Sequence, residues 1–105
     1  MSPPEQRYAA IVEALRLEPG VIHSTAKGFG AGGLKAAGKM FACLTPDHAL
    51  LLKLPAARVR ALIAAGEGRP FEPRPGRVMK EWVLVRPDAG TDWLGLAREA
   101  MDFVR

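Results

Sequence analysis

Cysteine and histidine are scarce in this sequence. Its 105 residues include one cysteine, Cys43, and two histidines, His23 and His48. A single cysteine cannot form an internal disulfide, and the three side chains match no metal-ligand spacing. We therefore expect a domain that folds around an apolar core, with no metal and no cofactor.

Long apolar runs are also missing. No stretch approaches the roughly 20 residues of a transmembrane helix, and the polar N-terminus does not resemble a signal peptide. The low cysteine count fits a reducing compartment. We expect a cytoplasmic protein without a membrane partner. Apolar residues make up 49% of the chain, enough for one ordinary core, so we expect a single domain over residues 1–105.

Two glycine-containing stretches match the residue spacing of nucleotide-binding motifs but lack other features that those motifs need. Residues 28–33 fit G-x-G-x-x-G, but the residues after them alternate as a strand instead of opening a helix. Residues 33–40 fit G-x-x-x-x-G-K, but Met40 stands where Ser or Thr binds magnesium. No motif pairs two carboxylates, and Cys43 lies in an apolar run without a base. The sequence therefore predicts no catalytic residue and no enzyme.

Hydrophobic periodicity and turn residues predict an α+β domain. Helices are expected over residues 3–17, 55–65 and 92–104, and strands over residues 21–26, 34–36, 39–45, 49–54 and 80–86. The order α-β-β-β-β-α-β-α favours a single antiparallel-rich twisted sheet with helices packed on one face. Residues 66–78 contain no predicted element.

Local signals refine this expectation. Ser2 and Thr91 are candidate N-caps, and Ala37-Gly38 is typical of a tight hairpin turn. In the last strand, Trp82 and Leu84 alternate with Glu81 and Val83. We expect Trp82 and Leu84 to face the helices and Trp82 to be mostly buried.

Positive charge is concentrated in the middle of the chain. Residues 27–86 carry eleven Lys and Arg against four Asp and Glu, a net charge of +7, whereas both ends are mildly acidic. The segment 69–82 mixes basic residues with prolines and aromatics, which suits a phosphate-contacting wing or a protein-binding loop. Candidate partner-binding residues are Lys39, Arg69, Arg74, Arg77 and Lys80.

Blander interpretations of the same segment are open. The basic surface can be merely solvated, and the arginines can pair with Glu67, Glu72 and Glu81. Phe71 and Trp82 can be core anchors of a rigid connector.

Several motifs resemble those of a known family. Glu18-Pro19-Gly20-Val21, Gly38-Lys39-Met40-Phe41-Ala42, Leu52-Lys53-Leu54-Pro55, Arg69-Pro70-Phe71 and the segment Gly76–Val85 resemble the TfoX/Sxy N-terminal domain family. The first half is also similar to the MmcQ/YjbR family. The first resemblance implies a role in transcription regulation beside a protein partner. The second implies DNA binding.

Three functions follow as hypotheses. The first is a non-catalytic regulatory or adaptor domain that binds protein. The second is weak, sequence-tolerant binding of nucleic acid through the basic loop, with a steep salt dependence. The third, an enzyme, would need a pocket with convergent polar groups, which the sequence does not indicate.

Overall fold

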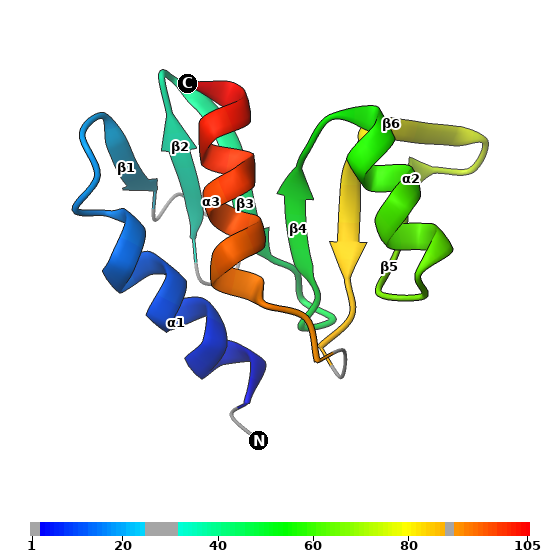
Figure 1. Ribbon diagram of the computed structural model, residues 1–105, viewed down its shortest axis with the longest axis horizontal. Coiled ribbons are helices and arrows are strands. Elements are labelled where there is room, and N and C mark those ends of the chain that lie inside the picture. Colours follow the sequence, from blue (N-terminus) through cyan, green and yellow to red (C-terminus); the bar gives the residue numbers. More distant parts are fainter. Residues whose placement is uncertain (1–2, 25–31, 88–89) are drawn as a thin grey trace.

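The computed structural model describes residues 3–24, 32–87 and 90–105 (Figure 1). The helices are α1 (Pro4–Leu15), α2 (Ala56–Ala64) and α3 (Trp93–Val104). The strands are β1 (Val21–Ser24), β2 (Gly33–Ala36), β3 (Lys39–Leu44), β4 (Leu50–Lys53), β5 (Gly68–Arg74) and β6 (Arg77–Val85). The expected fold class, an α+β domain with one antiparallel sheet, is confirmed. None of these helices is long and apolar enough to cross a membrane.

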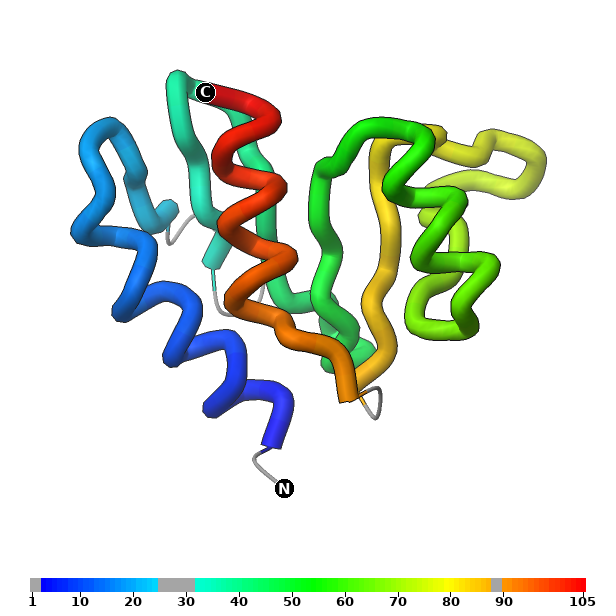
Figure 2. The backbone as a smooth tube through the Cα atoms, in the orientation of Figure 1, coloured from blue at the N-terminus to red at the C-terminus, as the bar shows by residue number. Residues whose placement is uncertain are grey.

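The six strands form one sheet in the order β1-β2-β3-β4-β6-β5, and every neighbouring pair is antiparallel. Figure 1 shows the three helices in front of this sheet. The α3 helix packs on β2, β3 and β4, α1 lies beside α3, and α2 packs on β5 and β6. The tube view shows the two chain ends at opposite ends of the molecule (Figure 2). The helices therefore split into an α1–α3 pair over one half of the sheet and α2 over the other.

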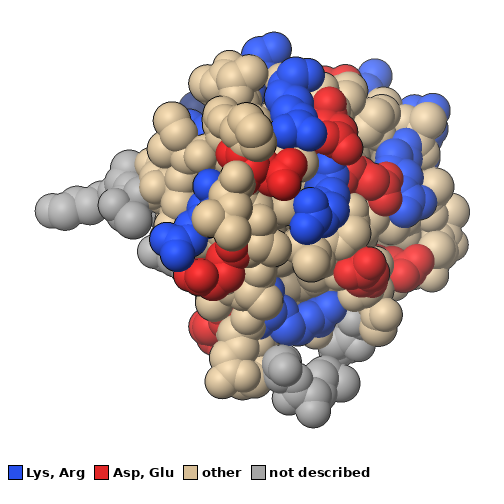
Figure 3. All heavy atoms as spheres, turned by 60° about the vertical axis from the view of Figure 1, so that its left-hand side comes forward, with Lys and Arg blue, Asp and Glu red and all other residues tan. Residues whose placement is uncertain are grey.

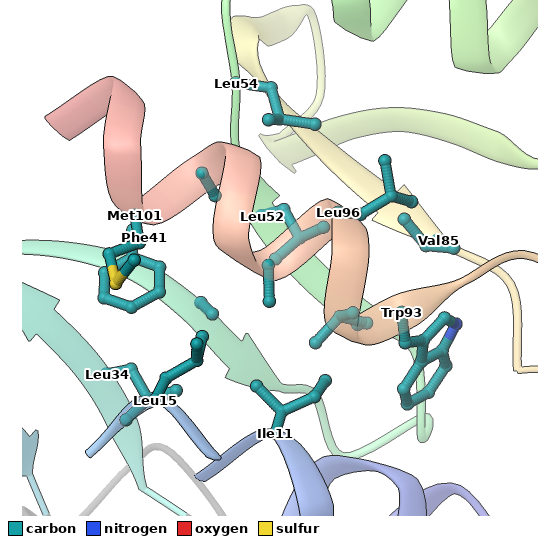
Figure 4. Packing of buried hydrophobic residues seen from close by; sticks show 14 of the residues in the cluster. Ile11, Leu15, Leu34, Phe41, Leu52, Leu54, Val85, Trp93, Leu96 and Met101 are labelled. Carbon is teal, nitrogen blue, oxygen red and sulfur yellow. The ribbon is translucent and has the colours of Figure 1, made fainter. Parts of the chain in front are cut away.

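The core lies between the sheet and the α1–α3 pair. Figure 4 shows Phe41 of β3 against Met101 of α3, with Leu52 of β4 close by. Phe41 is the extra residue on β3 between the pairs Leu34–Ala42 and Lys35–Met40, so the ladder is bulged there. A bulge lets two successive residues point to one side, and Phe41 and Ala42 are both fully buried.

The helix starts differ from the expected caps. Ser2 lies outside the described residues, and Pro3 occupies the N-cap position of α1. The Thr91 prediction was wrong by one residue: Asp92 caps α3, and its Oδ1 accepts a hydrogen bond from the Gly95 N–H at 3.0 Å. The Thr91 hydroxyl instead donates to Glu67 Oε1 at 2.6 Å. That bond ties the start of α3 to the segment before β5.

The expectation that residues 66–78 contain no element was wrong, because β5 and the start of β6 lie there. Pro70 and Pro73 argue against a strand, but β5 is the edge of the sheet, where a missing N–H is tolerated. Gly68 allows close packing on β6, since a Cβ there would lie 2.7 Å from Val83 Cγ2. The prolines and the glycine that obscured this strand in the sequence are therefore the residues that suit it to the edge of the sheet.

The expected facing of β6 was wrong for the core under the α1–α3 pair, although Trp82 does line a groove with side chains of α2. Val83 and Val85 are fully buried in the core, whereas Trp82 and Leu84 are only half-buried. All four residues are apolar, so alternation alone cannot decide which pair faces inward. The neighbouring strand decides it, because Val83 pairs with the buried Leu52 of β4.

The part of the glycine-rich stretch from residue 28 to residue 31 lies outside the described residues. So do residues 25 and 26, which were expected to end the first strand.

Candidate functional site

The hairpin of β5 and β6 extends beyond the rest of the sheet. The β4 strand pairs with β6 only from Trp82 to Val85, and one further bond joins the Leu54 N–H to the Glu81 carbonyl at 3.0 Å. Residues 71–80 are therefore a two-stranded ribbon, which we name the hairpin arm. Figure 1 shows it projecting at the upper right, in yellow-green.

Local interactions shape this arm. Pro75 and Gly76 form its turn, and Gly76 has a φ of +82°, which glycine adopts at low cost. The Glu72 carboxylate accepts a hydrogen bond from the Gly76 N–H at 2.6 Å, across the turn. At the base of the arm, the rings of Phe71 and Trp82 meet edge to face with centroids 6.5 Å apart. The turn and the ring pair fix the two ends of the ribbon.

The arm carries basic side chains without acidic partners. Arg74 and Arg77 stand directly opposite each other in the ladder, and like charges in that position are destabilising. Both side chains and Lys80 are exposed, and none of the three forms an ion pair within the described residues. The interpretation that the arginines of this segment pair with Glu67, Glu72 and Glu81 is therefore wrong for Arg74 and Arg77.

Three arginines on or beside the helices form ion pairs. Arg58 binds Glu99 at 3.0 Å, Arg16 binds Glu13 at 3.3 Å, and Arg105 binds Asp102 at 3.0 Å. Figure 3 shows the side of the molecule at the left of Figure 1, where acidic and basic atoms are interspersed. Among the described residues, Arg74, Arg77 and Lys80 thus lack the carboxylate partners that these three arginines have, a property they share with Arg60 of α2.

Two grooves flank Trp82 at the base of the arm. One, of about 630 Å³, is lined by Lys53, Arg77 and Lys80 among others. The second, of about 250 Å³, lies between α2 and the arm. Lys53 is a site residue that sequence reasoning missed: its Nζ lies 5.5 Å from the centre of the Trp82 ring and 4.0 Å from Glu81 Oε1. Its signal in the sequence was a single charge in an otherwise apolar strand.

The structure brings together only part of the predicted set. Arg74, Arg77 and Lys80 share the arm. Arg69 lies outside it, opposite Leu84 on the ladder. Lys39 opens β3, which β4 separates from β6. Because β3 and β6 run in the same direction, Lys39 and Arg77 lie at the same end of the sheet, but on different hairpins.

The buried titratable groups do not form a reactive centre. Burial raises the pKa of the Cys43 thiol to about 11, so it is protonated at neutral pH. Burial also raises the pKa of Tyr8, whose hydroxyl donates to the Gly32 carbonyl at 2.5 Å. Within the described residues, no three His, Cys, Asp or Glu side chains cluster as metal ligands. Both buried groups are packed as neutral core side chains.

Comparison with known proteins gives one match. A family model described as a Luciferase domain matches residues 38–98, more than half of the chain. The matched span runs from the β2–β3 turn into α3 and includes the whole hairpin arm. It supports in part the resemblance to the MmcQ/YjbR family and does not show the TfoX/Sxy family. No curated protein and no solved structure matches the chain.

Proposed function

The chain belongs to the Luciferase domain family, and for this member of it we propose a non-catalytic role in which the hairpin arm binds nucleic acid. The observation that carries the proposal is the facing pair of Arg74 and Arg77, with Lys80 nearby on the same arm and no carboxylate partner for any of them in the part of the chain that the structure describes. Repulsion across the pair is relieved when a polyanion binds, because phosphates supply the missing counter-charge.

The shape of the arm supports the same role. A two-stranded ribbon that projects from a sheet can follow a sugar–phosphate backbone without disturbing the core. The proline-containing edge and the tight turn limit the freedom that the arm loses on binding. Phosphate contacts of this kind fix position but carry no sequence information. The proposal is therefore weak binding with little sequence preference.

The non-catalytic part of the proposal rests on the described side chains. The family description names an enzyme, luciferase, but the linings of the two grooves beside Trp82 include no His, Cys, Ser, Thr or Tyr among the described residues. The one cysteine is protonated and buried away from them. These side chains favour a binding surface over a reaction centre.

A regulatory adaptor that binds protein is a second candidate. Val78 is 51% exposed on the same arm, and an exposed apolar side chain among cations suits an acidic protein partner. The salt dependence separates the two candidates, because binding to nucleic acid releases condensed counterions and therefore falls steeply with salt.

Amide NMR with unlabelled oligonucleotides tests the proposal. A 15-nucleotide DNA strand, its duplex and an acidic peptide of equal charge are titrated into the protein at low salt. We expect the DNA to shift the amides of residues 71–80 and to leave those of α1 unmoved. Shifts confined to α1 and α3, or no shift at low salt, would contradict the role. Shifts with the peptide alone would favour the adaptor.

A further inference from the structure

The groove between α2 and the hairpin arm combines apolar walls with basic side chains. Its apolar lining comes from two elements: Val59 and Ile63 of α2, and Val78, Met79 and Trp82 of β6. Two further lining residues, Arg60 and Lys80, are exposed, and neither forms an ion pair within the described residues. A ligand that satisfies both parts must be flat or apolar at one end and negatively charged at the other.

Trp82 stands at the junction of this groove with the larger one beside it, since its side chain lines both. It is half-buried, with Phe71 at the edge of its ring and the Lys53 ammonium 5.5 Å from the ring centre. Lys53 is paired with Glu81 at 4.0 Å, but Arg77 and Lys80, which line the larger groove with Trp82, are unpaired within the described residues. An aromatic ring beside such cations is the arrangement on which single-stranded nucleic acids stack their bases. The Met79 thioether adds a polarisable contact on the same strand.

From this arrangement we propose that the groove takes one unpaired nucleobase, so that the ligand of the arm is a single strand. The inference rests on the proposed function and names the class of nucleic acid. Arg77 and Lys80 hold the phosphates on either side of the base, while Trp82 and the α2 side chains cover its faces.

A duplex offers no unpaired base that can enter the groove. Its bases are already stacked and paired, and taking one out costs the energy of unstacking. Duplex DNA therefore engages the cations of the arm and leaves the groove empty. The account predicts a preference for single strands that depends on Trp82 and not on the number of phosphates.

The test compares a labelled strand of fifteen deoxythymidines, a fifteen-site abasic strand and a fifteen-base-pair duplex. Fluorescence anisotropy is measured with the parent chain, Trp82→Leu and Trp82→Phe, after urea unfolding has shown each variant to be folded. We expect the thymidine strand to bind at least tenfold tighter than the duplex. Trp82→Leu should lose roughly tenfold to hundredfold for this strand, and Trp82→Phe should restore most of that loss.

Tryptophan fluorescence of the parent chain provides a second readout that needs no variant. Trp93 is buried and Trp82 is half-buried, so a stacked base should quench Trp82. The thymidine strand should quench it and the abasic strand should not. Equal affinity for strand and duplex, or equal quenching by both strands, would overturn the nucleobase site. If substitutions of the arm cations still abolish binding in that case, the proposed function stands. No binding of any probe at low salt would overturn both.

Discussion

The central strands and the hairpin arm are built for different tasks. In β3, four of six residues are buried and in β4 three of four, whereas β5 has no buried residue. The central strands carry apolar side chains on both faces, and the arm carries cations that face each other without partners. Stability is thus concentrated in one half of the sheet. The other half can hold charges that reduce stability and favour a ligand.

The largest expected effect sharpens this contrast in stability. Phe41 of β3 is fully buried against α3, so Phe41→Ala should lower the free energy of unfolding by about 3–5 kcal/mol through the cavity it leaves. Val78→Ala in the arm should change it by less than about 0.5 kcal/mol. Urea unfolding of the two variants measures the difference. Equal losses would show that the arm is part of the cooperative core.

Arg7 gives a cation to compare with those of the arm. Its guanidinium donates to the carbonyls of Pro87 and Thr91, both at 2.9 Å, and lies 3.9 Å from the centre of the Trp93 ring. Arg7→Ala should cost about 2 kcal/mol, because two carbonyls lose a charged donor. Arg7→Lys should recover little, since an ammonium lacks the planar fork. Thermal unfolding measures both, and a neutral Arg7→Ala would mean that this cation is as dispensable as those of the arm.

A smaller effect depends on pH and probes the far face of the central strands. Burial raises the pKa of the Cys43 thiol from about 9 to about 11. The folded chain therefore holds this proton after the unfolded chain has lost it. The stabilisation is complete below pH 9 and declines as the pH rises toward 11.

Unfolding at pH 8 and pH 10 measures that decline. Between these two pH values, the free energy of unfolding of Cys43→Ala should fall by about 1 kcal/mol less than that of the parent. Tyr8 is present in both proteins, and its pKa is raised mainly by burial and less by Cys43, so most of its contribution cancels. The same pH dependence in parent and variant would show that the thiol is solvated.

Periodic burial made most of the fold predictable from the sequence. The three helices begin and end within two residues of their expected ends, and the Ala37-Gly38 turn joins β2 to β3 as expected. The edge strand β5 was missed because Pro70 and Pro73 mask its pattern. The inward pair of β6 was mistaken because four consecutive apolar residues have no unique alternation.

The candidate site was only partly predictable. Arg74, Arg77 and Lys80 were identified from local charge, but Arg69 was grouped with them as a near neighbour in sequence and Lys39 as a cation of the basic middle of the chain. Lys53 and the α2 side chains of the groove join the site through strand pairing and helix packing. Those contacts join residues far apart in the sequence, so no local sequence pattern predicts them.

The central claim is that the unpaired cations of the arm bind phosphates, and the salt dependence of binding tests it most directly. The variant Arg74→Ser/Arg77→Ser/Lys80→Ser is compared with Arg16→Ser/Arg98→Ser/Arg105→Ser, which removes the same charge from the C-cap of α1, from α3 and from the chain end. Anisotropy of a labelled 15-nucleotide strand is measured across a salt series. The arm variant should keep its stability within about 0.5 kcal/mol and lower the salt slope by roughly 2. The control should keep the slope of the parent, and an arm variant that binds with the affinity and slope of the control would contradict the account.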